Sequence, residues 1–323
     1  PDARVTFLVR EAVLPIVRMC SWVDDVIIAN EGRRLGSQYK DLRNRRFDAA
    51  VCLFPKLTVA GLLQRARIPV RVGTARRLYS FRFNRRVHVS RAGGGKHERD
   101  FNLDLLQGLA LDNPKVVDPV CEPPAEAVDQ AAQLLQRKGI LTNDEYPVAI
   151  VHPGCSGSAR NWSVDNYREL CRQLVDNGVK VVLSGAGSER ELAGAVAGDL
   201  KDRISIIAGE TDLETLAGIM QHADLFIGPS TGPMHLAAAV GLPVLALFGP
   251  VRTTTPDRWG PLGDRHHVFT PDVPTCNCKL DQCKLGDCMD RIAVPTVVEQ
   301  AVMIIRSQAK QAPATEQQNV QTR

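Results

Sequence analysis

Short apolar runs alternate with amphipathic segments along most of the 323-residue chain. Runs of about four to eight residues rich in Val, Ile and Leu predict buried strands, and apolar positions three or four residues apart predict helices. Strands that alternate with helices favour an α/β fold with parallel sheets. In the first half we expect strands at 4–9, 25–28 and 49–53, and helices at 57–66 and 98–109.

A second alternation begins after a proline-containing connection and a predicted helix at 125–138. Its predicted strands are 148–152, 180–184, 204–208, 224–228 and 243–248. Its predicted helices are 164–177, 189–200, 213–221 and 233–240, with Asp212 as a cap for the third of them. The pattern therefore predicts two domains, 1–143 and 144–295, then a helix at 296–307 and a polar, Gln-rich tail at 308–323 that we expect to be disordered.

The charge balance differs between the two halves, although the composition as a whole is that of a globular protein. Residues 1–111 hold 21 Lys and Arg against 10 Asp and Glu, a balance of +11, and the rest of the chain holds 19 against 26, a balance of −7. Eighteen of the first 21 are Arg, whose planar side chain suits bidentate contact with phosphate. The first half therefore predicts either an anionic partner, such as nucleic acid, membrane headgroups or a phosphorylated substrate, or a solvated basic face.

The nine cysteines are typical of reduced thiols in a cytosolic protein, since we see no secretory signal and most of them are scattered. The last four lie together: Cys276, Cys278, Cys283 and Cys288. Their spacing is neither that of a zinc ribbon nor that of a ferredoxin cluster. We favour loop thiols that are reduced or redox-sensitive, and a structural metal site is the alternative.

Two loops that follow predicted strands carry weaker signals. The segment 152–162 has small residues that let a backbone approach a phosphate closely, and Arg160 to clamp that phosphate, although a flexible loop is the alternative. Trp162, at its end, is expected to cover the core. The segment 182–190 approximates a dinucleotide-binding fingerprint, but Arg190 stands where the third glycine belongs, which favours a tight strand-to-helix turn.

A third loop, 228–239, carries the stronger signal. It places Ser230, Thr231 and Gly232 between a strand and a helix that begins near Pro233. Backbone N–H groups at such a helix start, together with two hydroxyls, suit a diphosphate. His235 falls near the start of this helix, on the side that we expect to face the same site.

Together these segments resemble glycosyltransferase family 9, the bacterial ADP-heptose:lipopolysaccharide heptosyltransferases. The likeness is carried by 228–239 with 241–250, the loop ending in 160–162, the turn 184–189, the segment 276–289, and 71–73 with 97–98 in the first half. The resemblance implies the GT-B fold, in which two Rossmann-like domains have parallel sheets facing a central cleft. The second domain would hold most of the nucleotide sugar.

The resemblance also implies a set of nucleotide-sugar-binding residues: Gly154, Cys155, Ser156, Arg160, Glu189, Thr211, Ser230, Thr231, Gly232 and His235. Arg160 would bind the diphosphate, and Glu189 and Thr211 would lie near the nucleoside. Some members carry Asp where this chain has Ser230, which leaves the identity of the donor open. The family's proposed general base is an Asp in a Gly-Asp turn, and we expect that turn, with the first strand and helix of the domain, to lie upstream of Pro1.

The function implied by the resemblance is inverting transfer of heptose, or a related sugar, from an ADP-activated donor to the lipopolysaccharide inner core. It requires no cofactor and no metal. The basic first domain would then bind an acidic, phosphorylated glycolipid acceptor, in peripheral contact with the cytoplasmic face of the inner membrane, and nucleic acid is not expected. A GT-B-type nucleotide-sugar epimerase and a non-catalytic nucleotide-sugar-binding protein are the alternatives.

Overall fold

The computed structural model describes residues 3–30, 37–91, 95–111, 116–141, 146–277 and 287–311, which fall into two compact units. Unit 1 is Pro1–Val117 together with Asp257–Trp259, and unit 2 is Asp118–Pro256 together with Gly260–Arg323. Within unit 1, Arg258 donates to the Glu98 carboxylate at 2.9 Å.

The division between the units comes earlier in the chain than the predicted boundary at 143. Helix α5 (Ala125–Arg137) belongs to unit 2 because it packs on α8 (Leu213–Gln221). A Cβ added at Gly218 would lie 2.7 Å from the Ala127 carbonyl oxygen, so the missing side chain lets the two helices approach closely. This long-range contact is invisible in the periodicity of either helix.

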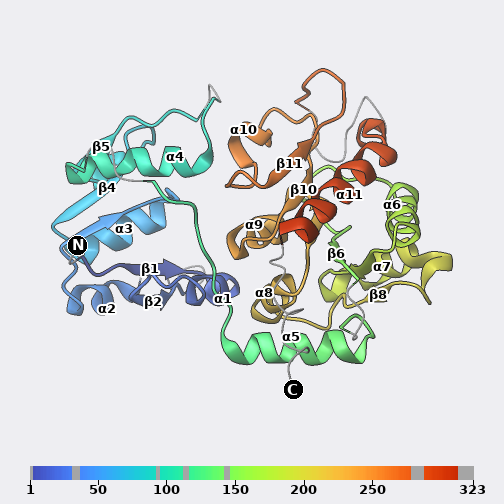
Figure 1. Ribbon diagram of the computed structural model, residues 1–323. Coiled ribbons are helices and arrows are strands. Elements are labelled where there is room, and N and C mark those ends of the chain that lie inside the picture. The colour runs from blue at the N-terminus through green and yellow to red at the C-terminus, as the bar shows by residue number, and fades with distance from the viewer. Residues whose placement is uncertain are drawn as a thin grey trace. The chain divides into compact units, whose positions relative to one another are not determined.

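Unit 1 contains two small parallel sheets among its described residues (Figure 1). In one, β1 (Thr6–Val9) pairs with β2 (Asp25–Ile28), and the other has the order β3–β4–β5. The strands of the second sheet are β3 (Ala49–Val51), β4 (Val70–Thr74) and β5 (Arg85–Val87). The helices are α1 (Leu14–Arg18), α2 (Tyr39–Asn44), α3 (Leu57–Arg65) and α4 (Glu98–Leu103).

Unit 2 is built on a six-stranded parallel sheet with the order β11–β10–β9–β6–β7–β8. Its strands are β6 (Val148–Val151), β7 (Lys180–Leu183), β8 (Ser205–Ile206), β9 (Leu225–Pro229), β10 (Val244–Leu247) and β11 (His266–Phe269). The other helices are α6 (Val164–Asp176), α7 (Arg190–Ala197), α9 (Gly232–Val240) and α11 (Val294–Gln311). The short helix α10 (Pro256–Trp259) lies between β10 and β11 in the chain, and all of it but Pro256 belongs to unit 1. Each strand predicted for this half is present, and β11 is an additional one.

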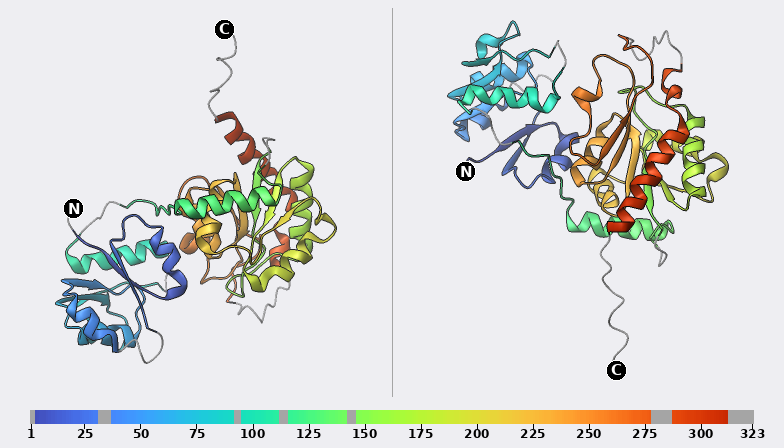
Figure 2. Two further views of the ribbon diagram at one scale, coloured as in Figure 1. Left: turned by 90° about the horizontal axis from the view of Figure 1, so that it is seen from below. Right: turned by 45° about the horizontal axis from the view of Figure 1, so that its top comes forward.

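Helices cover both faces of this sheet, as α/β architecture requires. Helix α6 packs on α7 and α11, and α8 packs on α5 and α9; the right-hand view of Figure 2 shows α11 running across the unit. Ala149 and Val151 share a core with Tyr167 of α6, whereas Val148 and Ile150 point the other way and are equally buried. The predicted α/β fold with parallel sheets is confirmed.

Two further predictions concern the C-terminal helix and the membrane. Helix α11 extends to Gln311, so the start of the predicted tail at 308 is helical, and the remainder of that tail lies outside the described residues. In the part of the chain that the structure describes, no helix is both long enough and apolar enough to cross a bilayer.

Candidate functional site

The strand order of unit 2 predicts a ligand-binding crevice at one edge of its sheet. The chain runs from β6 through β7 to β8 on one side, and from β9 through β10 to β11 on the other. The order therefore reverses between β6 and β9, and ligands of open α/β sheets bind at the carboxyl ends of the strands at such a reversal. The three predicted loops follow β6, β7 and β9, so all of them lie at this edge.

The Glu189 carboxylate joins the loop after β6 to the loop after β7. Its Oε1 accepts from the backbone N–H of Ser156 at 3.2 Å and from the Ser156 hydroxyl at 3.0 Å. Its Oε2 accepts from the backbone N–H of Ala186 at 2.9 Å. Three donors on a largely buried carboxylate offset much of its desolvation, so Glu189 stabilises the conformation of the phosphate-binding candidate loop.

Gly154 is the residue that makes room for this carboxylate. A Cβ added at Gly154 would lie 2.2 Å from Cδ of Glu189 and within 2.4 Å of both of its carboxylate oxygens. Ser156 has a φ of +44°, in the left-handed region that non-glycine residues rarely adopt, and Gly157 follows with a φ of +72°. The two hydrogen bonds from Ser156 to Glu189 hold this uncommon backbone conformation in place.

A buried histidine lies behind the same carboxylate. His152 directly follows β6, and its Nδ1 lies 3.0 Å from the hydroxyl of Ser184, which directly follows β7. Its Nε2 lies 3.9 Å from Oε2 of Glu189. Burial lowers the pKa of His152, and the nearby Glu189 carboxylate only partly opposes this shift. His152 is therefore neutral at pH 7 and acts as a hydrogen-bonding link between the two strand ends.

The side chain of Arg160 lies against a second glycine at this edge of the sheet, Gly249. A Cβ added at Gly249, just after β10, would lie 2.6 Å from Cβ and 2.9 Å from Cγ of Arg160. The loop after β6 therefore passes directly over the end of β10. The next turn is anchored in the core, because Trp162 is buried and its Nε1 donates to the Ile292 carbonyl at 3.1 Å. The prediction that Trp162 covers the core is confirmed.

Helix α9 begins at the crevice, beside the end of β9. Thr231 is its N-cap, with extended backbone, and Pro233 occupies its first turn. The Thr231 side chain makes no capping hydrogen bond to this helix, so the N-cap residue leaves the first backbone N–H groups open to an anion. Gly232 is exposed, Ser230 and His235 are half-buried, and Thr231 is buried. The position of this helix start is the one that the sequence predicted.

The remaining candidate residues lie at the same edge with less specific contacts. Thr211 is half-buried in the loop after β8, next to Asp212, which caps α8 by accepting from Thr215 N–H at 2.7 Å. Cys155 is half-buried, and its thiol donates to the Ala159 carbonyl at 3.5 Å. The structure thus joins Gly154, Ser156 and Glu189 directly and places the other candidates around them by strand order.

Three residues of this site were missed by sequence reasoning: His152, Ser184 and Gly249. Each directly follows a buried strand or lies within two residues of its end. Polar or very small residues at those points could have been a signal, because the carboxyl ends of parallel strands meet at one edge. Their partners come from other strands, and sequence spacing does not indicate such pairs.

The predicted cysteine cluster is only partly visible. Cys276 is half-buried and Cys288 is buried, while Cys278 and Cys283 lie outside the described residues. In the ranges that the structure describes, no group of three or more His, Cys, Asp and Glu side chains is placed to hold a metal ion. The choice between loop thiols and a metal site therefore stays a prediction.

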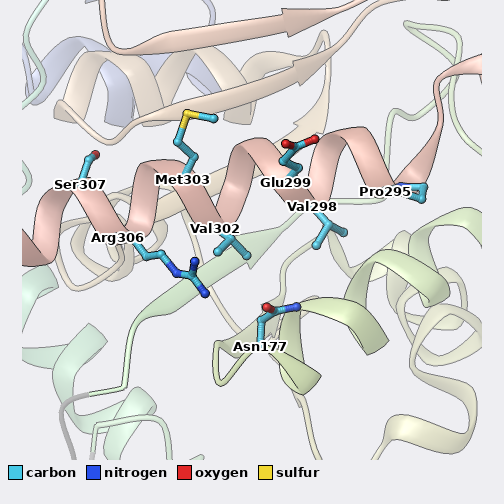
Figure 3. Close-up of a pocket in the computed structure, with 8 residues that line it drawn as sticks. All are labelled: Asn177, Pro295, Val298, Glu299, Val302, Met303, Arg306 and Ser307. Carbon is cyan, nitrogen blue, oxygen red and sulfur yellow. The ribbon is translucent and has the colours of Figure 1, made fainter.

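A groove of about 660 Å³ lies elsewhere on unit 2. Figure 3 shows Val298, Val302 and Arg306 pointing from α11 toward Asn177. Helix α6 runs from the carboxyl edge of the sheet back to the amino edge, where β7 starts. Asn177 directly follows α6 and so lies at the amino edge. The groove is therefore at the edge opposite the candidate site.

The chain is similar to known proteins in both sequence and fold. The family model of glycosyltransferase family 9 (heptosyltransferase) matches residues 35–289. Lipopolysaccharide heptosyltransferase 2 of Salmonella typhimurium is 29% identical over 245 residues, which cover 74% of this chain and 68% of that protein.

Two solved structures show the same fold. One is a glycosyl transferase of family 9 from Veillonella parvula, with a TM-score of 0.80 at 19% identity, covering 94% of this chain and 88% of that one. The other is the E. coli ADP-heptose lipopolysaccharide heptosyltransferase II, with a TM-score of 0.75 at 20% identity, covering 96% and 91%. The predicted GT-B class, with two Rossmann-like domains, is confirmed.

Proposed function

Because the chain belongs to glycosyltransferase family 9 (heptosyltransferase), we propose that it transfers heptose, or a related sugar, from an ADP-activated donor to the core of lipopolysaccharide. The chain is thus a glycosyltransferase by family, and the donor and acceptor are the proposed part. The names of two similar proteins support the proposed donor and acceptor. The Salmonella typhimurium protein is named a lipopolysaccharide heptosyltransferase, and the name of the E. coli structure contains ADP-heptose.

The observation that carries the proposal is the open start of α9 at the strand-order reversal, with the loop of Arg160 beside it. An NDP-sugar brings a diphosphate, and a helix N-terminus with an adjacent Arg suits that group. Unit 2 carries an excess of acidic residues, so local groups rather than net charge must attract the donor. We assign the diphosphate to Arg160, Thr231 and Gly232, and the sugar side to Ser230 and His235.

The proposed reaction is a direct displacement with inversion at the anomeric carbon. An acceptor hydroxyl attacks that carbon and gives up its proton to a general base, while the bond to the diphosphate breaks and the electron pair of that bond leaves with ADP. Arg160 and the start of α9 stabilise the negative charge that develops on the leaving diphosphate. Glu189 and Gly154 act through Ser156 as positioning residues, and Thr211 is assigned to the nucleoside side. These residues act on the leaving group, and we assign no residue of this chain as the general base.

The acceptor side of the proposal rests on unit 1. Its excess of Arg suits a phosphorylated, acidic glycolipid, and such an acceptor lies at a membrane surface. We therefore place the protein on the cytoplasmic side of the inner membrane, in peripheral contact with it.

A transfer assay with defined products tests the function. The protein is incubated with ADP-heptose and a heptose-deficient core oligosaccharide, and the products are analysed by mass spectrometry. We expect ADP release together with an acceptor that is heavier by one heptose. Epimerised free sugar without acceptor modification would indicate the epimerase alternative, and ADP-heptose binding without turnover would indicate a non-catalytic protein.

A further inference from the structure

Two loops of unit 1 expose large apolar side chains. Leu78 is 100% exposed, Phe54 70% and Phe81 67%, and Leu57 is also exposed. Phe54 and Leu57 follow β3, and Leu78 and Phe81 follow β4. Since β3 and β4 are neighbouring parallel strands, both loops leave the same edge of the sheet. We call these four residues the apolar tip.

The conformation of the apolar tip is fixed by hydrogen bonds. The Tyr79 hydroxyl donates to the Pro55 carbonyl and so ties one loop to the other. The Ser80 hydroxyl donates to the Thr74 carbonyl at 2.6 Å and accepts from the backbone N–H of Arg77 at 3.1 Å. These bonds close the turn that carries Leu78. The exposure therefore belongs to an ordered loop.

The segment of chain that carries the apolar tip is basic. Residues 49–97 contain 11 Lys and Arg and no Asp or Glu. Lys56 Nζ lies 4.9 Å from the ring centroid of Phe54, and Arg82 Cζ lies 5.3 Å from that of Phe81. Arg76 and Arg77, directly before Leu78, are both exposed. Apolar side chains among cations are typical of surfaces that bind anionic membranes.

We propose that the apolar tip docks unit 1 on an anionic lipid bilayer. Leu78 and Phe81 enter the boundary between headgroups and acyl chains, and the neighbouring Lys and Arg side chains bind lipid phosphates. The inference rests on the proposed function, because a glycolipid acceptor would be presented at such a surface. The charge favours a bilayer over a protein partner, since a bilayer offers many phosphates to a segment, 49–97, that contains cations and no Asp or Glu.

Co-sedimentation with lipid vesicles tests the docking. The wild-type chain is expected to bind vesicles of phosphatidylglycerol and phosphatidylethanolamine, to bind phosphatidylcholine vesicles much more weakly, and to release from the former as salt is raised. The double variant Leu78→Ser/Phe81→Ser should lose about tenfold or more in vesicle affinity. Its salt dependence should stay that of the wild type, because its charges are unchanged.

Two more variants separate charge from apolar area. The double variant Arg76→Gln/Arg77→Gln should bind more weakly and with a smaller salt dependence. Met303→Ser removes an exposed apolar side chain of unit 2 and should bind vesicles like the wild type. The altered side chains are exposed, so the melting temperature of each variant should match that of the wild type.

The same protein samples distinguish this inference from the proposed function. Transfer from ADP-heptose to an acyl-free core oligosaccharide needs no membrane and should be the same in Leu78→Ser/Phe81→Ser as in the wild type. If the wild type transfers heptose but does not bind vesicles, the docking proposal alone is overturned. The same holds if Leu78→Ser/Phe81→Ser binds vesicles as tightly as the wild type. Vesicle binding without transfer would overturn the function alone.

Discussion

Replacing Glu189 by glutamine removes one of the two acceptors that join the loops after β6 and β7. The carboxylate accepts on both oxygens, from Ser156 on one and from Ala186 N–H on the other. Glutamine has the same shape but only one acceptor oxygen, and its other end is an NH₂ group that donates. Whichever way the amide turns, an N–H group from the protein faces that NH₂ group.

The cost of this substitution follows from the number of donors left unsatisfied. A hydrogen bond contributes about 0.5–1.5 kcal/mol to stability, and a bond to a charged group about 1.5–3 kcal/mol. We expect the amide oxygen to turn toward Ser156, which offers two donors, and to leave one N–H, that of Ala186, unsatisfied. Glu189→Gln should therefore lower the free energy of unfolding by about 1–3 kcal/mol.

Denaturant unfolding and calorimetric titration of ADP measure both consequences. The affinity for ADP should fall as well, because Ser156 loses the group that holds its left-handed conformation. Glu169→Gln is a matched control, since Glu169 accepts from Arg172 at 2.7 Å on the exposed face of α6. That control should change the free energy of unfolding by less than about 1 kcal/mol and leave ADP affinity unchanged. Equal stability and equal ADP affinity of Glu189→Gln and wild type would refute the positioning role of Glu189.

Three further predictions concern the same region and the buried thiols. Gly154→Ala should destabilise by about 1–3 kcal/mol, seen in denaturant unfolding, because its Cβ would collide with the Glu189 carboxylate. Below pH 6.5, the ordinary pKa of His, His152 is protonated in the unfolded chain, whereas burial keeps it neutral in the folded protein. Acidification therefore favours the unfolded state, and the free energy of unfolding of the wild type should decrease relative to that of His152→Gln. An increase on acidification, measured by unfolding at a series of pH values, would mean that Glu189 dominates the shift instead. Burial raises the pKa of Cys52 to about 11 and that of Cys171 to about 12, so alkylation at neutral pH should spare both thiols, as peptide mass spectrometry would show.

Most of unit 2 could be predicted from the sequence because its strands and helices are locally consistent. The run 148–151 is buried on both faces, and its neighbours in the sheet are runs of the same kind. Helix 213–221 was predicted with its observed ends, since Asp212 supplies a cap and the apolar spacing stops at Gln221. Unit 1 was harder: β4, which contains the polar Arg71 and Thr74, was not among the predicted strands. The strands that were predicted there gave no sign that they would divide into two sheets.

In the candidate site, too, features formed by residues adjacent in sequence were predictable, and contacts between distant segments were not. The open start of α9 was predictable because hydroxyl residues, Gly232 and Pro233 are adjacent in sequence. The link from His152 to Ser184 was not, because it joins the ends of two strands 32 residues apart. From the sequence, Gly154 was expected only as a small residue that lets the backbone approach a phosphate. The structure adds that Gly154 makes room for the Glu189 carboxylate.

The measurement that tests the central claim most directly is calorimetric titration of ADP into the wild type and Arg160→Ala. Removing a charge-assisted contact to the diphosphate should weaken ADP binding by about 1.5–3 kcal/mol, which is roughly tenfold or more. Arg203→Ala, which removes an exposed Arg paired with Asp176, serves as the control and should bind ADP like the wild type. The account predicts loss in the first variant only, and an Arg160→Ala protein that binds ADP as tightly as the wild type would contradict it.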